Sequence, residues 1–476
     1  MLVMREAVNN TLRLQLAKDN WDKIDIRAAC LCLSGRWTAV VGLKQEPCIE
    51  VSKEVQAKAY FTTISYPFIM KASLSWLLYA TAASASSHNS HPHPVRAAAA
   101  IDASTIQGKW LYGYQGWFRK PGAGVNNHWS ADGNTPGPNN IEIDFIPDVS
   151  QYPVNCLFNT GLTLPNGQPA KFYDATCDGV VDLHFKWMQQ YGIDGVIVQR
   201  FLSSINDQSF ITILNQVKAA AEKYGRGFIV EYDVSGADSS QGSVANQVLN
   251  DYNSKIKPYT TSSAYIHQNG KPVTMVFGIG FQGMKTSAAD SLNIANQLKN
   301  AGLYVGFGVP EQWAGDVNSN SGFVQAYKAA DFISPWTVGG YSAAGYQGFH
   351  SSVQVPDSQL LQSLGKKYAP VIFPGTSAYH INGGTNPSAF DYFPRNNGSF
   401  FSAQADALTS MAIKPLFIFN AMFDEVNEGT QSMPALKVNQ LPTNQKFVGV
   451  DNDFPDTSFY LSLGGQKAAA FHAAAQ

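Results

Sequence analysis

Short apolar segments alternate with amphipathic segments between residues 108 and 464 of this chain. The apolar segments are rich in Val, Ile, Phe and Tyr and lack polar alternation, which is typical of parallel strands buried on both faces. We expect strands at Trp110–Tyr114, Gly195–Phe201, Gly227–Asp233, Val273–Phe277, Tyr304–Gly308, Asp331–Trp336, Ala369–Pro374 and Pro415–Ala421.

The segments between these strands have the periodicity of helices that cover a sheet. We expect helices at Val180–Tyr191, Gln208–Tyr224, Ser243–Lys257, Ala288–Ala301, Ser321–Ala330, Pro356–Tyr368 and Phe401–Ala412. This alternation predicts the α/β class and a single (β/α)8 TIM barrel. A helix after the eighth strand is also required, and Phe454–Gly464 or the Ala-rich tail is the candidate.

Residues 70–85 have the layout of a secretory signal peptide. Lys71 precedes a short apolar run that ends in the small residues Ala83-Ser84-Ala85, and the run is too short to span a bilayer. Because signal peptides act at the start of a chain, we expect residues 1–69 to be a mispredicted extension. The alternative is a core segment of a longer N-terminal domain. Residues 86–107 then form a linker, and 108–476 form the catalytic domain.

Two sequence features accompany the expected secretion. Cys156 and Cys177 are the cysteines that follow residue 70, and they either form one disulfide or stay as two buried thiols. Asn397-Gly398-Ser399 is a glycosylation sequon. We therefore expect a secreted, extracellular protein with no membrane anchor.

Composition narrows the class of ligand. Charged residues make up 14% of the chain and the formal net charge is -2, which argues against nucleic acid and anionic membranes as partners. Aromatic residues make up 12%, a composition that suits a protein binding neutral polar ligands such as sugars. We expect a poly- or oligosaccharide partner, no cofactor, no metal and a monomer.

Polar and aromatic residues recur where the predicted strands end. In a parallel barrel these ends share one rim, so a ligand pocket is expected there. For two of the candidate residues a purely structural role is the alternative: Arg200 could form an ion pair with Asp233, and Trp336 could belong to the core. The candidate binding residues are Tyr114, Gln115, Trp117, His128, Trp129, Gln199, Arg200, Tyr232, Asp233, Trp313, Trp336, Tyr379 and Asp424.

Three carboxylates, Asp424, Glu425 and Glu428, follow the eighth predicted strand. Paired carboxylates at a barrel rim are what glycoside hydrolysis requires: one acid, and one base or nucleophile. The alternative interpretation is a solvated acidic turn. Glu425 and Glu428 are therefore the candidate catalytic residues.

The segment Glu425-x-x-Glu428-Gly429-Thr430 resembles the signature of glycoside hydrolase family 99. Val426 stands where that family has Trp and Asp424 where it has Asn, so the likeness does not extend to mannoside specificity. Other motifs resemble a related family 71/99-like group, labelled xylosidase/arabinosidase. They are Tyr112–Trp117, His128-Trp129, Gln199–Phe201 and Tyr232–Gly236.

This resemblance implies a retaining mechanism. Glu425 would take a proton from the 2-hydroxyl of the substrate, which attacks the anomeric carbon. Glu428 would protonate the leaving oxygen and then activate water. Glu428 then needs a raised pKa, whereas Glu425 should stay ionised, helped by a cation such as Arg200. Two other classes remain open: a non-catalytic carbohydrate-binding barrel, and a carboxylate-dependent lyase.

Overall fold

The computed structural model describes residues 98–122 and 126–475, together with four strands near the N-terminus. The chain divides into two units, Met1–His88 and Asn89–Gln476. In the first unit the strands form an antiparallel sheet in the order β1-β2-β3-β4. They are β1 (Leu2–Val8), β2 (Thr11–Leu16), β3 (Arg27–Leu33) and β4 (Arg36–Gly42). The predicted signal segment 70–85 and residues 86–97 of the predicted linker lie outside the described residues.

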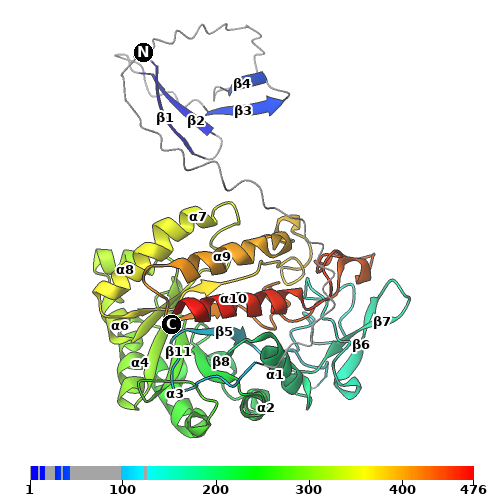
Figure 1. The fold of residues 1–476 in the computed structure, drawn as a ribbon, viewed down its shortest axis with the longest axis vertical. Coiled ribbons are helices and arrows are strands. Elements are labelled where there is room, and N and C mark those ends of the chain that lie inside the picture. Colours follow the sequence, from blue (N-terminus) through cyan, green and yellow to red (C-terminus); the bar gives the residue numbers. More distant parts are fainter. Residues whose placement is uncertain are drawn as a thin grey trace, which may run out of the picture. The chain divides into compact units, whose positions relative to one another are not determined.

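The second unit is a parallel barrel with helices around it (Figure 1). Its strands follow the order β14-β13-β12-β11-β9-β8-β5-β16-β15. Order and pairing confirm the predicted (β/α)8 fold, with β8 and β9 lying where they were expected. The bounds are β5 (Lys109–Tyr114), β8 (Gly195–Phe201), β9 (Gly227–Asp233), β11 (Lys271–Phe277), β12 (Tyr304–Pro310), β13 (Phe332–Trp336), β14 (Lys367–Tyr368), β15 (Val371–Ile372) and β16 (Phe417–Asn420).

The barrel closes through an interrupted seventh strand. β14 pairs with β13, whereas β15 pairs with β16, so the two short strands share one position in the ring. The predicted strand Ala369–Pro374 contains β15, whereas the separate strand β14 before it was not predicted. Pro370 lies between the two pieces and has no N–H to donate, although its carbonyl accepts the N–H of Phe419 at 3.0 Å.

Helices cover the outside of the barrel, and α1 and α2 have the predicted bounds. The helices are α1 (Val180–Tyr191), α2 (Gln208–Tyr224), α3 (Val244–Asp251), α4 (Ala288–Asn300), α5 (Trp313–Ser319), α6 (Val324–Ala329), α7 (Tyr346–Phe349), α8 (Val355–Ser363), α9 (Ser399–Ser410) and α10 (Phe459–Ala475). The tail supplies the required last helix, α10, which lies beside α9 (Figure 1). No helix in the described part of the chain is long and apolar enough to cross a membrane.

Alternation along the strands decides which side chains reach the barrel interior. Trp110 packs its ring against Phe471 of α10, and the hydroxyl of Tyr114 forms a hydrogen bond with Nδ1 of His184 of α1, so these side chains point outward. Arg200 also points outward, to Asp251 of α3. The neighbouring residues Gln115, Gln199 and Glu231 therefore point to the other side, inward at the carboxyl ends of β5, β8 and β9.

The long segment between β5 and α1 contains a hairpin that the sequence analysis missed. Its strands are β6 (Leu157–Thr163) and β7 (Pro169–Tyr173); a further short strand, β10 (His267–Gln268), pairs with β11. Cys156 and Cys177 are joined by a disulfide, which confirms the predicted bond. This bond connects the start of the hairpin to the residues that lead into α1.

Candidate active site

Asp424 connects the turn after β16 to the end of β5. Its two carboxylate oxygens accept the backbone N–H groups of Gln115 and Gly116 at 2.9 and 2.8 Å. Burial nevertheless raises the pKa of Asp424 to about 6, although the two N–H groups act in the opposite direction. Asp424 thus fixes the relative position of the two strand ends.

Glu425 is buried beside Asp424 and is held on both carboxylate oxygens. Gln115 donates its Nε2 hydrogen to Oε1 at 2.9 Å, and Thr430 donates its hydroxyl to Oε2 at 3.0 Å. Burial, and then the neighbouring charge of Glu428, raise the pKa of Glu425 well above its ordinary value. Both causes act against the ionised form that the sequence analysis expected for Glu425, and the second cause disappears when Glu428 is protonated, so an ionised Glu425 requires that Glu428 carry the proton.

Glu428 lies at the surface of the same turn. Its side chain is exposed, and its backbone carbonyl accepts the N–H of Ser377 at 3.0 Å. The surrounding protein still displaces enough water to raise the pKa of Glu428, in the direction expected for an acid. The turn therefore presents one buried and one accessible carboxyl group.

A buried arginine supports the turn that carries Glu428. Arg395 donates from Nη2 to the carbonyls of Gly429 and Gln431 at 2.9 and 2.7 Å. Its guanidinium also lies over the rings of Phe145 and Tyr460, at 4.5 and 4.4 Å from their centroids. Sequence analysis missed Arg395, because no local pattern links it to a turn more than thirty residues later in the chain.

Another carboxylate, Glu231, lies at the inward-facing end of β9. Gln199 donates to its Oε2 at 2.6 Å, and its Oε1 has no partner among the described residues. Burial raises the pKa of Glu231 to about 8, while the bond from Gln199 lowers it. Asp233, two residues on, accepts the N–H of Ser235 at 2.7 Å, and burial raises its pKa as well.

The partner of Arg200 is neither of the two that the sequence analysis expected, Asp233 and Glu425. Arg200 bonds to Asp251 through Nε and Nη2 at 3.1 and 2.7 Å, with both side chains buried. It therefore neither pairs with Asp233 nor supplies a cation to Glu425. The physical reason is strand parity: Arg200 faces the helix layer, whereas its neighbours Gln199 and Phe201 face the other way.

Trp117 and His128 meet at the edge of the site. Their rings stack at 4.1 Å between centroids with an interplanar angle of 6°, and Phe201 stacks against Trp117 at 5.3 Å. Desolvation, and secondarily Arg119, lower the pKa of His128 to about 4, so the imidazole is neutral at pH 7. A recess of about 310 Å³ lies here, and Gln115, Trp117, His128 and Gln199 help to line it.

Four predicted binding residues are instead part of the packed interior. Each is buried and bonds to protein: Tyr114 to His184, Trp129 to the carbonyl of Tyr173, Tyr232 to Asp251, and Trp313 to Asp357. The structure does not bring these side chains to the recess.

The remaining predicted residues lie apart from the recess. Trp336 contacts Phe277 and Phe419, as its core alternative implies. Tyr379 is half-buried in the loop after β15, and its N–H bonds to Asp144 at 2.7 Å. Asn397 is exposed, so its side chain is accessible for modification.

Asp144, which the sequence analysis also missed, organises the loop beside Glu428. This fully buried carboxylate accepts hydrogen bonds from the backbone N–H groups of Tyr379 and His380, at 2.7 and 2.9 Å, and contacts His380 Nδ1 at 2.6 Å. Its interaction with the hydroxyl of Ser377 joins the same network. The described residues contain no cluster of His, Cys, Asp and Glu that could hold a metal ion.

Comparison with known proteins relates this architecture to a solved enzyme fold. No family model and no curated protein matches the chain. The GH99 endo-alpha-mannosidase from Bacteroides thetaiotaomicron is similar in structure, with a TM-score of 0.56 and 16% identity over 78% of this chain and 99% of that one. Its complex with bis-tris-propane gives a TM-score of 0.55 at the same identity and coverage. At this identity the likeness shows that the chain has the barrel fold of such glycoside hydrolases.

Proposed function

We propose that this protein is a retaining glycoside hydrolase that uses Glu425 and Glu428 on a poly- or oligosaccharide. The observation that carries the proposal is the pair itself: two carboxyl groups with raised pKa values on one turn at the carboxyl end of a barrel strand. An acidic turn with only a structural role would have its carboxylates solvated or paired with cations. The described residues form no ion pair with Asp424, Glu425 or Glu428.

The environments of the two groups favour different roles. Glu428 is accessible, so it can protonate the oxygen of a departing sugar as the glycosidic bond breaks. Glu425 is buried and oriented by Gln115 and Thr430, so it can accept the proton of the 2-hydroxyl while that oxygen bonds to the anomeric carbon. Water then attacks the anomeric carbon and breaks its bond to the 2-oxygen; the water gives a proton to Glu428, while Glu425 returns its proton to the 2-oxygen.

The proposal predicts that Glu425 and Glu428 together carry one proton before the reaction begins. Loss of that proton removes the acid, and a second proton removes the base, so kcat/KM should have a bell-shaped pH dependence. Because the pKa values of both groups are raised, kcat/KM should fall on the acid side of the profile at a pH above the ordinary pKa of a glutamate.

The test is release of reducing ends from α-mannans, glucans, xylans and arabinans by the full chain and by its Glu428→Gln variant. We expect wild type alone to release reducing ends, and NMR of the first product to show retained anomeric configuration. Inverted product would disprove the retaining mechanism. Binding of a glycan without release by either protein would favour the carbohydrate-binding alternative, and an unsaturated product would indicate a lyase.

A further inference from the structure

The two carboxylate oxygens of Glu425 have partners of the same chemical kind. Oε1 accepts a hydrogen bond from the side-chain amide of Gln115 at 2.9 Å, and Oε2 accepts one from the hydroxyl of Thr430 at 3.0 Å. An amide carries an acceptor oxygen beside its N–H donors, and a hydroxyl both donates and accepts. Each partner can therefore bond to an ionised carboxylate as a donor and to a protonated carboxyl group as an acceptor.

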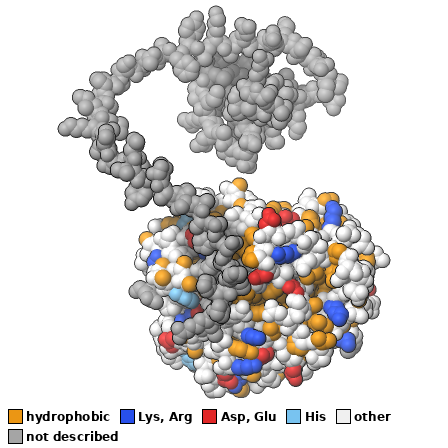
Figure 2. Space-filling model, turned by 45° about the vertical axis from the view of Figure 1, so that its right-hand side comes forward, with side chains coloured by type: hydrophobic (Ala, Val, Ile, Leu, Met, Phe, Trp, Pro, Cys, Tyr) orange, Lys and Arg blue, Asp and Glu red, His pale blue; other side chains and the backbone are white. Residues whose placement is uncertain are grey.

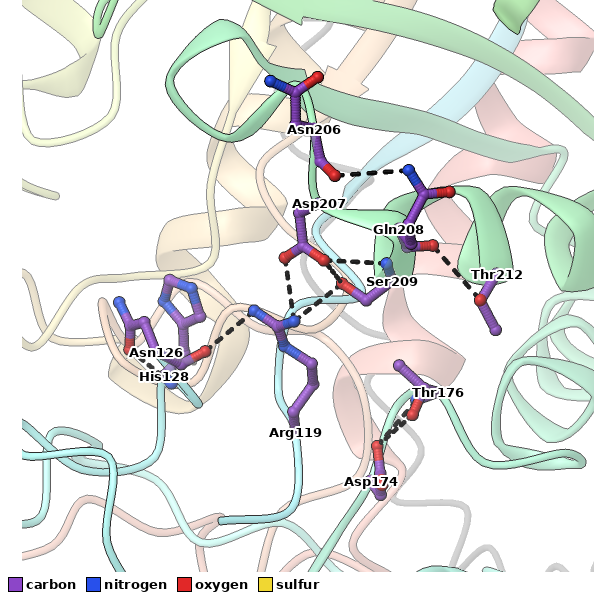
Figure 3. Close-up of polar contacts among 10 residues, drawn as sticks. All are labelled: Arg119, Asn126, His128, Asp174, Thr176, Asn206, Asp207, Gln208, Ser209 and Thr212. Atoms are coloured by element: carbon purple, nitrogen blue, oxygen red, sulfur yellow. Dashed lines mark hydrogen bonds and ion pairs between the residues drawn. The ribbon is translucent and has the colours of Figure 1, made fainter. Parts of the chain in front are cut away.

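A structural carboxylate has other kinds of partner, as Asp207 at the start of α2 shows (Figure 3). Among its partners are the backbone N–H of Ser209, at 2.9 Å, and Nη1 of Arg119, at 2.9 Å. A backbone N–H and a guanidinium only donate, so each can bond to the ionised oxygen and neither can accept a proton from a protonated one. Such partners favour one protonation state.

The same distinction separates the buried carboxyl groups of the described residues. Most have at least one partner that only donates, which is a backbone N–H, a guanidinium or an indole N–H. These groups are Asp144, Asp194, Asp233, Asp251, Asp357 and Asp424. The exceptions in the described structure are Glu425 and Glu231, and Glu231 is held by the side-chain amide of Gln199. Burial raises the pKa of Glu231 to about 8, so that group carries a proton at pH 7, and an amide suits a carboxyl group that does so.

Thr430 has a second acceptor for its hydroxyl hydrogen within reach. Its Oγ1 lies 3.5 Å from the main-chain carbonyl oxygen of Glu425 and 3.0 Å from Oε2. Rotation about the Cβ–Oγ1 bond moves the hydrogen from Oε2 to this carbonyl, and Oγ1 then accepts from a protonated Oε2. Only a hydrogen moves, so this fully buried side chain keeps its packing.

Gln115 can make the same exchange by turning its amide over. Its Oε1 is buried and has no hydrogen-bond partner among the described residues. Turning the amide brings this oxygen to Oε1 of Glu425, in place of Nε2. The single side-chain bond that is broken is the one to Glu425 itself, and the new bond replaces it.

We propose that Gln115 and Thr430 are positioning residues that exchange donor for acceptor as Glu425 takes up and returns a proton. Glu425 starts the reaction ionised, holds the proton of the 2-hydroxyl while the 2-oxygen is bonded to the anomeric carbon, and then gives it back. Partners of this kind keep the carboxyl group oriented in both states. This inference rests on the proposed function and adds to it how the base stays in place while its charge changes.

Hydrolysis by the full chain tests Thr430. Thr430→Val removes both donor and acceptor, so kcat should fall about 10- to 100-fold with little change in KM. Burial and the charges of Glu428 and Asp424 raise the pKa of Glu425, whereas the hydroxyl of Thr430 lowers it. The fall of kcat/KM on the acid side should therefore move to higher pH in Thr430→Val. Thr430→Ser restores a hydroxyl and should recover most of the lost kcat. Unchanged kcat in Thr430→Val, or no recovery in Thr430→Ser, would overturn the inference.

Gln216→Met is the matched control for Gln115→Met. Nε2 of Gln216 also donates to a carboxylate, that of Asp178, at 3.2 Å, and its Oε1 is likewise buried without a partner among the described residues. Gln115→Met should lower kcat about as much as Thr430→Val does, whereas Gln216→Met should keep the wild-type kcat. Equal kcat in Gln115→Met and Gln216→Met would remove Gln115 from the inference.

NMR of the full chain separates this inference from the proposed function. Isotope-labelled glutamine gives the side-chain amide of Gln115, assigned by its absence in Gln115→Met, and labelled glutamate gives the carboxyl titration of Glu425, assigned by its absence in Glu425→Gln. As pH falls, we expect the amide protons of Gln115 to shift upfield with the midpoint of Glu425, because the bond to an ionised oxygen is lost when the amide turns. Those of Gln216 should not follow Glu425.

The two possible failures are distinguishable. A wild type that cleaves no glycan but shows this shift would lose the proposed function and keep the exchange of donor for acceptor. Amide protons of Gln115 that do not respond to Glu425 would overturn the exchange, whether or not the protein hydrolyses a glycan.

Discussion

Acidic residues lie at both ends of the barrel strands, but their surroundings are opposite. At the amino ends, Asp194 before β8 accepts the N–H of Trp110 at 2.6 Å and lies 2.7 Å from His472 Nε2. Asp331 before β13 likewise accepts the N–H of Val305 at 2.9 Å and pairs with Lys299 at 2.8 Å. Each of these acids ties a neighbouring strand to a basic side chain.

At the carboxyl ends, Asp424, Glu425 and Glu428 share one turn with no basic partner within ion-pair distance among the described residues. Burial and repulsion between the two carboxylates raise the pKa of Glu425. Such an arrangement makes ionisation unfavourable, so it is more typical of a functional site than of an acid with only a structural role. The comparison teaches that Asp194 and Asp331 at the amino end of the barrel are paired with basic side chains, while the acids of the turn after β16 are left unpaired by the described residues, as the proposed proton transfer requires. The face drawn in Figure 2 shows charged side chains of both signs, scattered singly or in small groups.

The largest effect should come from Glu425→Gln. Removing the base should lower kcat/KM by about 10² to 10⁴-fold. It should also raise the free energy of unfolding at pH 8, because a buried carboxylate no longer has to ionise beside Glu428. Glycan hydrolysis and urea denaturation measure the two quantities. A variant that loses both activity and stability would place Glu425 among the structural acids.

The next largest effect should be the pH dependence of stability that Glu231 produces. Its pKa is about 8 in the folded protein against about 4.5 in the unfolded chain, so its contribution to stability is full below pH 4.5 and is lost as pH rises toward 8. Between pH 5 and 8 wild type should lose up to about 4 kcal/mol relative to Glu231→Gln, at about 1.4 kcal/mol per unit. Urea denaturation at several pH values tests this. Parallel stability curves for the two proteins would show that Glu231 ionises normally.

Asp194→Asn tests the other end of the barrel. Losing the charge should cost roughly 1 to 3 kcal/mol, because Asp194 is buried and its contacts to Trp110 and His472 weaken. The kcat of the folded variant should stay at the wild-type value, since Asp194 lies at the end of the barrel opposite Glu425. Thermal denaturation and glycan hydrolysis give the two readings. A fall in kcat without loss of stability would contradict the division between the ends.

The sequence predicted the barrel well where burial determines the pattern. Strands such as Gly195–Phe201 are apolar because helices and the barrel interior cover both faces, and their bounds match the structure. The interrupted strand at Pro370 was harder, because only the pairing shows that the chain changes partner there. The sequence analysis overlooked the hairpin β6–β7, although Asn166-Gly167 between its two strands is a turn signal.

The candidate site was predictable in part. Asp424, Glu425 and Glu428 follow a buried strand, so their position at the rim followed from the fold alone. Tyr114 and Gln115 were both expected in the pocket, but successive residues of a strand face opposite sides, and only Gln115 reaches Glu425. Arg395 and Asp144 act through contacts between distant segments, which no local pattern in a single sequence reveals.

The smallest effect should come from Lys299→Met at the amino end. The Lys299–Asp331 pair is partly exposed, so solvent screens it and its loss should cost only about 0.2 to 1 kcal/mol. In this variant Asp331 still accepts the hydrogen bond from the N–H of Val305, so the strand ends should stay connected. The loss should shrink further in 1 M salt, where exposed charges are screened over about 3 Å. Urea denaturation at low and high salt measures this. A loss as large as that of Asp194→Asn, and independent of salt, would mean that Lys299 supports the barrel through packing rather than through its charge.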